Sequence, residues 1–272
     1  MRIYHYTSLD NLALILKNKT IRFNRLDRLD DPNERNFYSF GLNWSPYTYV
    51  SCWTEKEEEN IPLWHMYSKN GVGIRIAIDK DCIDWGKCIQ KGLKETRLIR
   101  QTPTPRGQKM RILKYIPFAI FGEISTTKCY HSIKYYKEPL NTNGMIEIGA
   151  NKTTVLNELT ETNFWDYIGL YKDVKWAFQN EVRFRLFAVP IESIKDTLPF
   201  DEFRNIIAEE RPNPFTYIDL PLKEAAFDNL EITLGPNATE STSIIVKLLI
   251  KEFAPSAKIE GSSLNSDTWF YL

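Results

Sequence analysis

Cysteine and histidine are scarce in this chain. Its 272 residues include four cysteines and three histidines. Cys52, Cys82, Cys88 and Cys129 are scattered along the sequence, and no two of them form a Cys-x-x-Cys pair. These residues are too few and too dispersed for a disulfide framework, and they argue against a structural zinc site.

Neither sign of charge is in excess, because 35 Lys and Arg side chains balance 35 Asp and Glu side chains. The molecule as a whole therefore has no field that would draw it to nucleic acid or to an anionic membrane. The stretch 87–114 is a local exception, since its nine basic side chains face a single acid, Glu95. Pro103, Pro105 and Gly107 predict an irregular basic loop or lid over residues 87–111.

Several sequence features that would assign the chain to a particular class of protein are also missing. The sequence has no run of about eighteen apolar residues, so no membrane span is expected. The opening MRIYHYTSLD has no apolar secretion segment, so we expect a cytoplasmic protein. The sequence contains no GxGxxG, GxxxxGK[ST], GxSxG or HExxH motif, which weakens the Rossmann, P-loop, hydrolase and zinc-protease interpretations.

The patterns that are present predict a single α+β domain over 1–272, because strands and helices mix without regular βαβ units. The helix at 240–253 is amphipathic, and its Ile and Leu side chains at 244, 245, 248 and 249 are expected to face inward. The predicted strands are 2–6, 20–23, 47–54, 73–79, 181–189, 216–220, 230–234 and 258–261. The predicted helices are 9–18, 61–69, 154–176 and 240–253, with a β-hairpin formed by 112–124 and 129–136 and a loop at 141–151.

The first strand carries polar groups. His5 and Thr7 share one strand face, and Tyr6 takes the other. His and Thr together present hydrogen-bonding groups suited to ribose hydroxyls. The structural alternative is a polar strand end that caps the next helix.

A late strand carries a second polar set. Glu181, Arg183 and Arg185 lie on one face, opposite Phe184 and Leu186. A Glu beside two Arg is usually a structural ion pair with a lowered pKa. The functional alternative is a carboxylate held ionised to orient a sugar hydroxyl and to stabilise positive charge at an anomeric carbon.

Aromatic side chains gather in SCWTEKEEENIPLWHMYSKNG. Trp64 and Tyr67 are three residues apart on one helix, and Trp53 precedes them on a strand. Core packing explains such a set, and so does a stacking wall for a flat ring such as nicotinamide. The acidic run 55–59 is expected to be a solvated face or a helix start.

Two resemblances arise at these residues. Six blocks resemble the bacterial domain of unknown function family 2971: IYHYTSLDNLALILKNKTIRF, LDDPNE, VSCWTE, PLWHMYSKNGVGIRIAI, KWAFQNEVRF and LEITLGP. Asp30 stands where that family usually has Asn, and Asn180 where it usually has Glu. More distantly, YHYTS with the following helix is similar to the opening of the DarT-like and RNA phosphotransferase-like branches of the ADP-ribosyltransferase superfamily. Glu181 resembles the catalytic Glu of that superfamily.

The resemblance implies a role for each candidate residue. His5 would bond the adenosine ribose of NAD, with Thr7 supporting the cofactor. Tyr67 or Trp64 would stack on nicotinamide, and Glu181 would bond the nicotinamide ribose 2′-hydroxyl. The remaining candidates shape the strand-end wall or close over the cofactor: Tyr6, Asp31, Asn33, Arg35, Ser51, Trp53, Thr54 and Arg183.

The resemblance further implies a split, mostly antiparallel sheet of the ADP-ribosyltransferase type with flanking helices. Residues 1–86 would form the cofactor-binding half, and 112–272 would contribute the catalytic strand and the C-terminal helix. The implied activity is NAD-dependent mono-ADP-ribosylation of a nucleic acid or a protein by a bacterial toxin or anti-phage effector. An antitoxin or defence partner would accompany such a protein, and the basic stretch would suit a nucleic-acid target. A non-catalytic sensor or binding module and an NAD hydrolase remain the alternatives.

Overall fold

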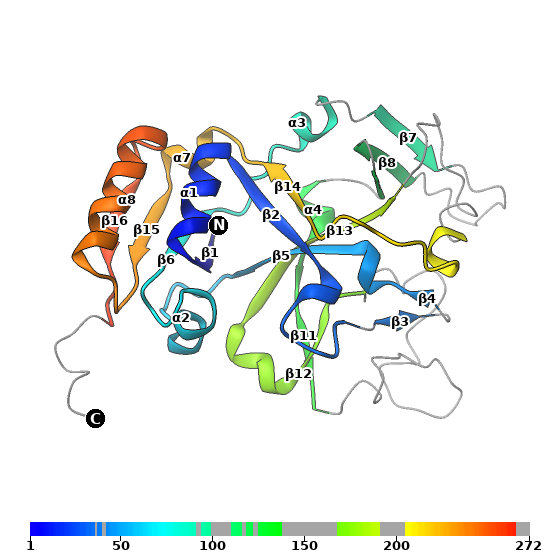
Figure 1. Ribbon diagram of the computed structural model, residues 1–272, viewed down its shortest axis with the longest axis horizontal. Helices are drawn as coiled ribbons and strands as arrows, with labels where there is room; N and C mark the ends of the chain where they lie inside the picture. Colours follow the sequence, from blue (N-terminus) through cyan, green and yellow to red (C-terminus); the bar gives the residue numbers. More distant parts are fainter. Residues whose placement is uncertain are drawn as a thin grey trace.

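The main sheet of this protein divides at the strand β5 (Thr48–Thr54) (Figure 1). The computed structural model describes residues 1–35, 37–39, 42–90, 94–98, 110–115, 118–121, 125–137, 168–190 and 205–264. Within them, no helix has both the length and the apolar character needed to cross a membrane.

Short strands and a few helices alternate along the chain. The other strands are β1 Arg2–Thr7, β2 Thr20–Arg25, β3 Tyr38–Ser39, β4 Leu42–Asn43, β6 Ile74–Asp79, β7 Lys94–Leu98, β8 Met110–Tyr115, β9 Phe118–Phe121, β10 Tyr130–Ser132, β11 Lys134–Tyr136, β12 Tyr171–Asp173, β13 Glu181–Pro190, β14 Tyr217–Pro221, β15 Glu231–Leu234 and β16 Lys258–Gly261. The α-helices are α1 Leu9–Asn18, α2 Ile61–Tyr67, α3 Trp85–Gln90, α4 Thr126–Cys129, α7 Ala225–Asp228 and α8 Glu240–Phe253, and the 3-10 helices are η1 Leu26–Arg28, η2 Ser45–Tyr47 and η5 Val174–Gln179.

Twelve of the described strands form one sheet. Nine of them follow the order β16-β15-β6-β1-β5-β13-β9-β8-β7, while β10 pairs with β13 and β14 pairs with β2. Every pairing in this sheet is antiparallel except that of β15 with β16. The α+β class, the mostly antiparallel sheet and the flanking helices are therefore confirmed.

The sheet is split because two strands share one edge of β5. β13 occupies the other edge along its whole length, from Glu181 opposite Thr54 to Phe187 opposite Thr48. On the shared edge, β1 pairs with β5 only at Thr54, and β2 pairs only at residues 49 and 50. Residues 51–53 of β5 therefore lie in the fork between β1 and β2.

Two hydrophobic cores lie on the two faces of β13. Phe184 and its even-numbered neighbours join the larger core, which α1 and α8 cover with Leu12, Leu16, Val246 and Ile250 (Figure 1). The odd-numbered residues Phe187 and Val189 join the second core, while residues 181, 183 and 185 on that same face are charged. The alternation expected of a strand thus places buried charges beside the fork.

Local signals position the helices that flank the fork. The Ser8 hydroxyl caps α1 by accepting a hydrogen bond from the Asn11 amide (3.3 Å), and Lys19 in the left-handed conformation ends the helix. Asn60 caps α2 by accepting from the Leu63 amide (3.1 Å), with Pro62 in the first turn. Both helix starts agree with the sequence prediction.

A close backbone approach secures β6 against β1. A Cβ atom on Gly73 would lie 2.4 Å from the carbonyl oxygen of Thr7. A Cβ atom on Gly235, just after β15, would lie 2.1 Å from the carbonyl oxygen of Gly71. Both positions therefore require glycine, and together they fix the approach to β6 between β1 and β15.

Three predictions about the middle of the chain are wrong. Residues 87–111 are not one irregular loop, because they include the end of α3, the strand β7 and the start of β8. The expected hairpin is replaced by different pairings: β8 pairs with β9, while β10 pairs with β13 and β11 with β12. Where a helix was predicted over 154–176, the structure has the strand β12 at residues 171–173. Residues 154–167 of that prediction and the predicted loop 141–151 lie outside the described residues.

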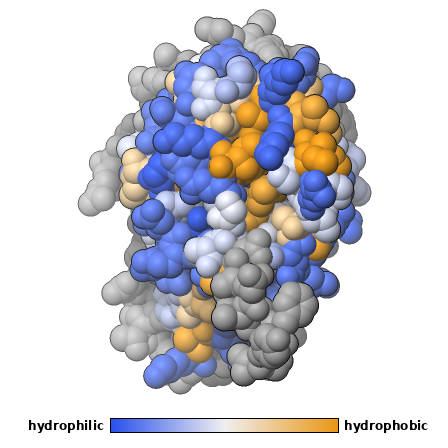
Figure 2. Space-filling model, turned by 90° about the vertical axis from the view of Figure 1, so that its left-hand side faces the viewer, coloured by the Kyte–Doolittle hydropathy of each residue, from blue (hydrophilic) through white to orange (hydrophobic). Residues whose placement is uncertain are grey.

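The inward face predicted for α8 is wrong for three of its four residues, whereas Leu249 packs against the core as predicted and the bounds of the helix agree. Ile244, Ile245 and Leu248 are 51%, 43% and 62% exposed, whereas Val246 and Ile250 are buried. The helix is apolar on two sides, so periodicity alone could not decide which side packs inward. Hydrophobic side chains accordingly gather on the face of the molecule shown in Figure 2.

Candidate functional site

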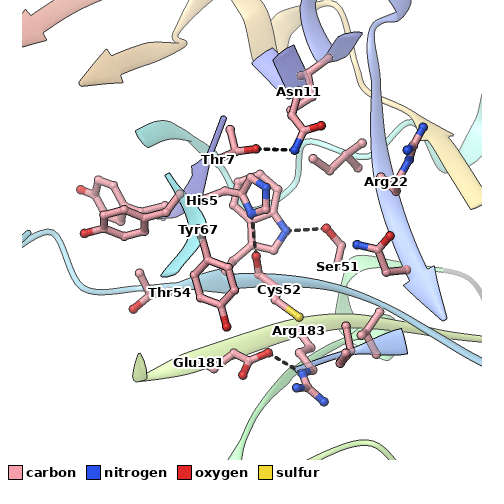
Figure 3. Close-up of a pocket in the computed structure, with 18 of the residues that line it drawn as sticks. His5, Thr7, Asn11, Arg22, Ser51, Cys52, Thr54, Tyr67, Glu181 and Arg183 are labelled. Atoms are coloured by element: carbon pink, nitrogen blue, oxygen red, sulfur yellow. Dashed lines mark hydrogen bonds and ion pairs between the residues drawn. The ribbon is translucent and has the colours of Figure 1, made fainter. Parts of the chain in front are cut away.

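A pocket of about 400 Å³ lies in the fork of the sheet (Figure 3). Its walls come from β1, α1 and β2 on one side and from β12, β13 and the end of α2 on the other. Residues 50–54 of β5 run between them. This volume falls within the range of small-molecule sites, roughly 300–1,000 Å³. Residues of both expected halves of the chain therefore meet in one cavity.

His5 lines this pocket as a neutral imidazole. Its Nδ1 lies 2.8 Å from the backbone carbonyl oxygen of Cys52. Because a carbonyl can only accept, Nδ1 carries the proton and Nε2 is left as an acceptor. Burial lowers the pKa of His5, against the opposing effect of that hydrogen bond. A neutral His5 can accept a hydrogen bond from a sugar hydroxyl.

A wall of aromatic and polar groups surrounds His5. The ring of Trp53 lies 5.0 Å from the imidazole, and its indole nitrogen donates to the Ser51 hydroxyl (3.0 Å). Asn11 of α1 donates to the Thr7 hydroxyl (3.1 Å), as Figure 3 shows. These bonds hold four pocket side chains in fixed positions before any ligand arrives.

Glu181 lines the other part of the pocket and is held between two cations. Its Oε1 accepts from Arg183 Nε (2.5 Å), and its Oε2 accepts from Lys172 Nζ (2.7 Å). Burial would raise the pKa of Glu181, but the two cations outweigh burial and lower the pKa to about 2. The carboxylate is therefore ionised at neutral pH although it is only 6% exposed.

A hydrogen-bonded chain joins Glu181 to Tyr67. Lys172 Nζ also donates to Gln179 Oε1 (2.8 Å), and Gln179 Nε2 donates to the Tyr67 hydroxyl (2.9 Å). Burial raises the pKa of Tyr67, and the nearby charge of Glu181 acts in the same direction, so its hydroxyl is protonated. Tyr67 is 37% exposed, and its ring borders the cavity beside the carboxylate (Figure 3).

Arg183 is fully buried and bridges two carboxylates. Its two terminal nitrogens both donate to the Glu34 carboxylate, and the distance from Nη2 to Oε2 is 2.9 Å. Nη1 also donates to the backbone carbonyl oxygen of Gly169 (2.6 Å). Burial raises the pKa of Glu34, which Arg183 and Lys172 oppose. The expected ion pair at Glu181 is confirmed, but its second cation is Lys172, while Arg185 donates to the Ile168 carbonyl (2.6 Å).

The pocket brings together most of the residues predicted from the sequence. His5 and Glu181 border one cavity with Tyr67, which is the arrangement that favours an enzyme. A binding module would be favoured if Glu181 were locked to Arg183 or Lys175 in a filled core; Glu181 is paired with Arg183, but it borders a cavity. The predicted residues that line the pocket are His5, Tyr6, Thr7, Ser51, Trp53, Thr54, Tyr67, Glu181 and Arg183.

Trp64 does not line the pocket, contrary to the prediction. Its side chain is 1% exposed and packs edge-on against Tyr6, with ring centroids 4.8 Å apart. Its indole nitrogen donates to Glu59 (2.9 Å). Trp64 thus anchors α2, and Tyr67 alone of this helical pair is placed to stack on a ligand.

The turn residues Asp31, Asn33 and Arg35 do not line the pocket either. Asp31 is buried and accepts a hydrogen bond from the Asn33 amide (2.9 Å), which shapes the turn. Arg35 donates to the Leu29 carbonyl (3.3 Å) and is exposed. The turn instead contributes Asp30 to the cavity and Glu34 to the charges behind it.

The acidic run 55–59 is not only a solvated face. The Glu59 carboxylate accepts hydrogen bonds from Ser262, from Ser263 and from Trp64. It thereby ties the segment after β16 to α2. Glu55 accepts from the Tyr130 hydroxyl (2.7 Å).

The residues at the site that sequence reasoning missed include Glu34, Cys52, Lys172, Gln179, Asn11 and Asp30. The block LDDPNE contains Glu34, but nothing in its polar surroundings indicates that this carboxylate is buried. Among the described residues, no group of three or more His, Cys, Asp and Glu side chains is placed to hold a metal ion.

No protein-family model matches the chain, and no curated protein or solved structure matches it.

Proposed function

We propose that this protein transfers ADP-ribose from NAD to a macromolecular acceptor, a nucleic acid or a protein. The observation that carries the proposal is that a neutral imidazole, an aromatic ring and a carboxylate with a lowered pKa border the same pocket. In this assignment the His5 imidazole accepts from the adenosine ribose, and Tyr67 stacks on nicotinamide. Glu181 accepts from the 2′-hydroxyl of the nicotinamide ribose.

The chemistry asked of Glu181 is electrostatic. The bond between C1′ of the ribose and the nicotinamide nitrogen breaks, its electron pair leaves with neutral nicotinamide, and positive charge develops on the sugar. A fixed carboxylate beside the 2′-hydroxyl stabilises that charge without reorganising. The acceptor then bonds to C1′ and loses one proton to solvent.

The test replaces Glu181 by Gln. The purified protein is incubated with NAD labelled in its adenylate part, first alone and then with cell lysate, and nicotinamide release and label incorporation are measured. We expect Glu181→Gln to lower release by about 100-fold or more, as for the loss of a preorganised transition-state contact. Glu231→Gln is the matched control, because Glu231 is 37% exposed, pairs with Arg2 and does not line the pocket.

Each outcome of this test has a distinct meaning. Incorporation into nucleic acid or protein supports transfer and identifies the acceptor class. Nicotinamide release without incorporation indicates that water is the acceptor, so the protein would be an NAD hydrolase. Unchanged release in a folded Glu181→Gln protein removes Glu181 from the chemistry.

A specific observation favours a second candidate, a non-catalytic binding module. Glu181 belongs to a cluster of two carboxylates and two cations, all of them buried. Such a cluster would fix the architecture of a sensor equally well. NAD binding without nicotinamide release by the wild-type protein would support this candidate.

A further inference from the structure

Glu34 is a buried carboxylate that lies behind the pocket rather than in it. Its side chain is 3% exposed, and it is not among the residues that line the cavity. It comes from the turn between η1 and β3, which is 149 residues away from Arg183 in sequence. A buried charge at such a place requires a strong partner.

Arg183 is that partner, and Glu34 determines which of its edges Glu181 can reach. Both terminal nitrogens of Arg183 donate to Glu34, and one also donates to the carbonyl of Gly169. Only Nε is directed to Glu181. Without Glu34, the guanidinium could turn and present two nitrogens to Glu181, the pairing that Arg and carboxylate usually form.

A single hydrogen bond from Arg183 leaves Glu181 with acceptor capacity. An ionised carboxylate offers about four acceptor positions. Arg183 Nε takes one and Lys172 Nζ takes another. The Cys52 thiol, which is also hydrogen-bonded to Glu181, takes a third, and the remaining position is available to a hydroxyl in the pocket.

Glu34 also sets the charge of the cluster. Arg183 and Lys172 carry two positive charges, which Glu34 and Glu181 balance, and Lys172 Nζ lies 3.7 Å from Glu34 Oε2. Without the Glu34 charge the cluster would be net positive. It would then oppose, rather than stabilise, positive charge developing on a ligand beside it.

We propose that Glu34 is a positioning residue for Glu181: by holding the terminal nitrogens of Arg183 it keeps Glu181 singly bonded to that arginine and open to the ribose hydroxyl. This inference rests on the proposed function for its effect on catalysis. The arrangement it describes can also be tested without NAD.

The kinetic test compares Glu34→Gln and Glu34→Asp with the wild-type protein. We expect Glu34→Gln to lower kcat per folded molecule by about 10- to 100-fold. The Kd for NAD should change less than about threefold, because Glu34 does not border the cavity. Glu34→Asp keeps the charge but shortens the side chain, so its kcat should lie between that of Glu34→Gln and that of the wild-type protein. Asp27→Asn is the matched control, since Asp27 pairs with the buried Arg25 outside the pocket (2.6 Å), and it should leave kcat unchanged.

A role confined to stability would give a different result. Glu34→Gln would then lower the melting temperature and leave kcat per folded molecule unchanged, which would overturn the proposal. If Glu34→Gln does not fold, Glu34→Asp decides the question: we expect an intermediate kcat with unchanged Kd, and a wild-type kcat would count against Glu34.

A crystal structure of Glu34→Gln separates failure of this inference from failure of the proposed function. The inference predicts that Arg183 turns and donates to Glu181 through two nitrogens. An Arg183 that keeps only Nε on Glu181 would overturn it, whether or not the protein acts on NAD. A wild-type protein that releases no nicotinamide, combined with a turned Arg183 in the variant, would refute the transferase activity alone.

Discussion

Replacing Arg183 by Met should destabilise the protein more than any comparable change on its surface. Met matches much of the length of Arg but carries no charge. Two buried carboxylates, Glu34 and Glu181, would then share only Lys172. Arg183 itself is fully buried, so no water can replace the hydrogen bonds that it donates.

The magnitude follows from this burial. Breaking a buried ion pair by removing one partner costs about 3–5 kcal/mol, because the other charge is left uncompensated. At about 2–4 °C per kcal/mol for a domain of this size, the melting temperature should fall by roughly 6–20 °C. An exposed pair behaves differently: Lys69 and Asp10 are 68% and 75% exposed, and Lys69→Met should cost less than about 1 kcal/mol.

Urea unfolding followed by tryptophan fluorescence measures both variants. A third protein, which combines Arg183→Met with Glu34→Gln and Glu181→Gln, removes the stranded charges as well and should recover most of the lost free energy of unfolding. The reasoning would be refuted if Arg183→Met cost less than about 1 kcal/mol, or if the triple variant were no more stable than the single one.

Three further predictions concern the pocket and the sheet. Tyr67→Ala should raise the Kd for NAD by about 10-fold or more and lower the melting temperature little, because Tyr67 is 37% exposed and borders the pocket. If the variant lost as much free energy of unfolding as free energy of NAD binding, Tyr67 would belong to the core. Gly73→Ala should lower the free energy of unfolding, measured by chemical denaturation, by several kcal/mol, because the new Cβ would lie 2.4 Å from a backbone carbonyl oxygen of β1. A Cβ on Gly261 meets nothing within 4 Å, so Gly261→Ala should be nearly neutral. Similar losses in the two variants would show that the close approach at Gly73 does not constrain the sheet. NAD turnover should show no fall centred near pH 6.5, because the pKa of Glu181 is about 2 and burial lowers the pKa of His5 below its usual value; a fall centred near pH 6.5 would contradict these states.

Local signals explain which elements the sequence predicts well. The bounds of α8 and β16 agree with the predicted 240–253 and 258–261, and Ser8 caps α1 as expected. Each of these features depends on a few adjacent residues: a cap, a period or a turn. The strand β7 and the start of β8 were missed because the segment around them is rich in charge, proline and glycine, which masks strand propensity.

The candidate site was predicted in part for the same reason. His5 with Thr7 and Glu181 with Arg183 are recognisable because each pair lies on one strand face. Glu34 was not recognisable, because Arg183 is 149 residues away in sequence and burial of a charge leaves no mark on composition. Lys172 was not recognisable, because it lies in β12, which falls within the predicted helix 154–176. Trp64 and Tyr67 share a helix, yet only the packed fold shows that one enters the core and the other the pocket.

A crystal structure of the protein with bound NAD tests the central claim most directly. We predict that the dinucleotide spans the fork of the sheet, with the 2′-hydroxyl of the nicotinamide ribose within hydrogen-bonding distance of the Glu181 carboxylate and the adenosine ribose at His5. NAD bound elsewhere, or a pocket that stays empty at saturating NAD, would contradict the account.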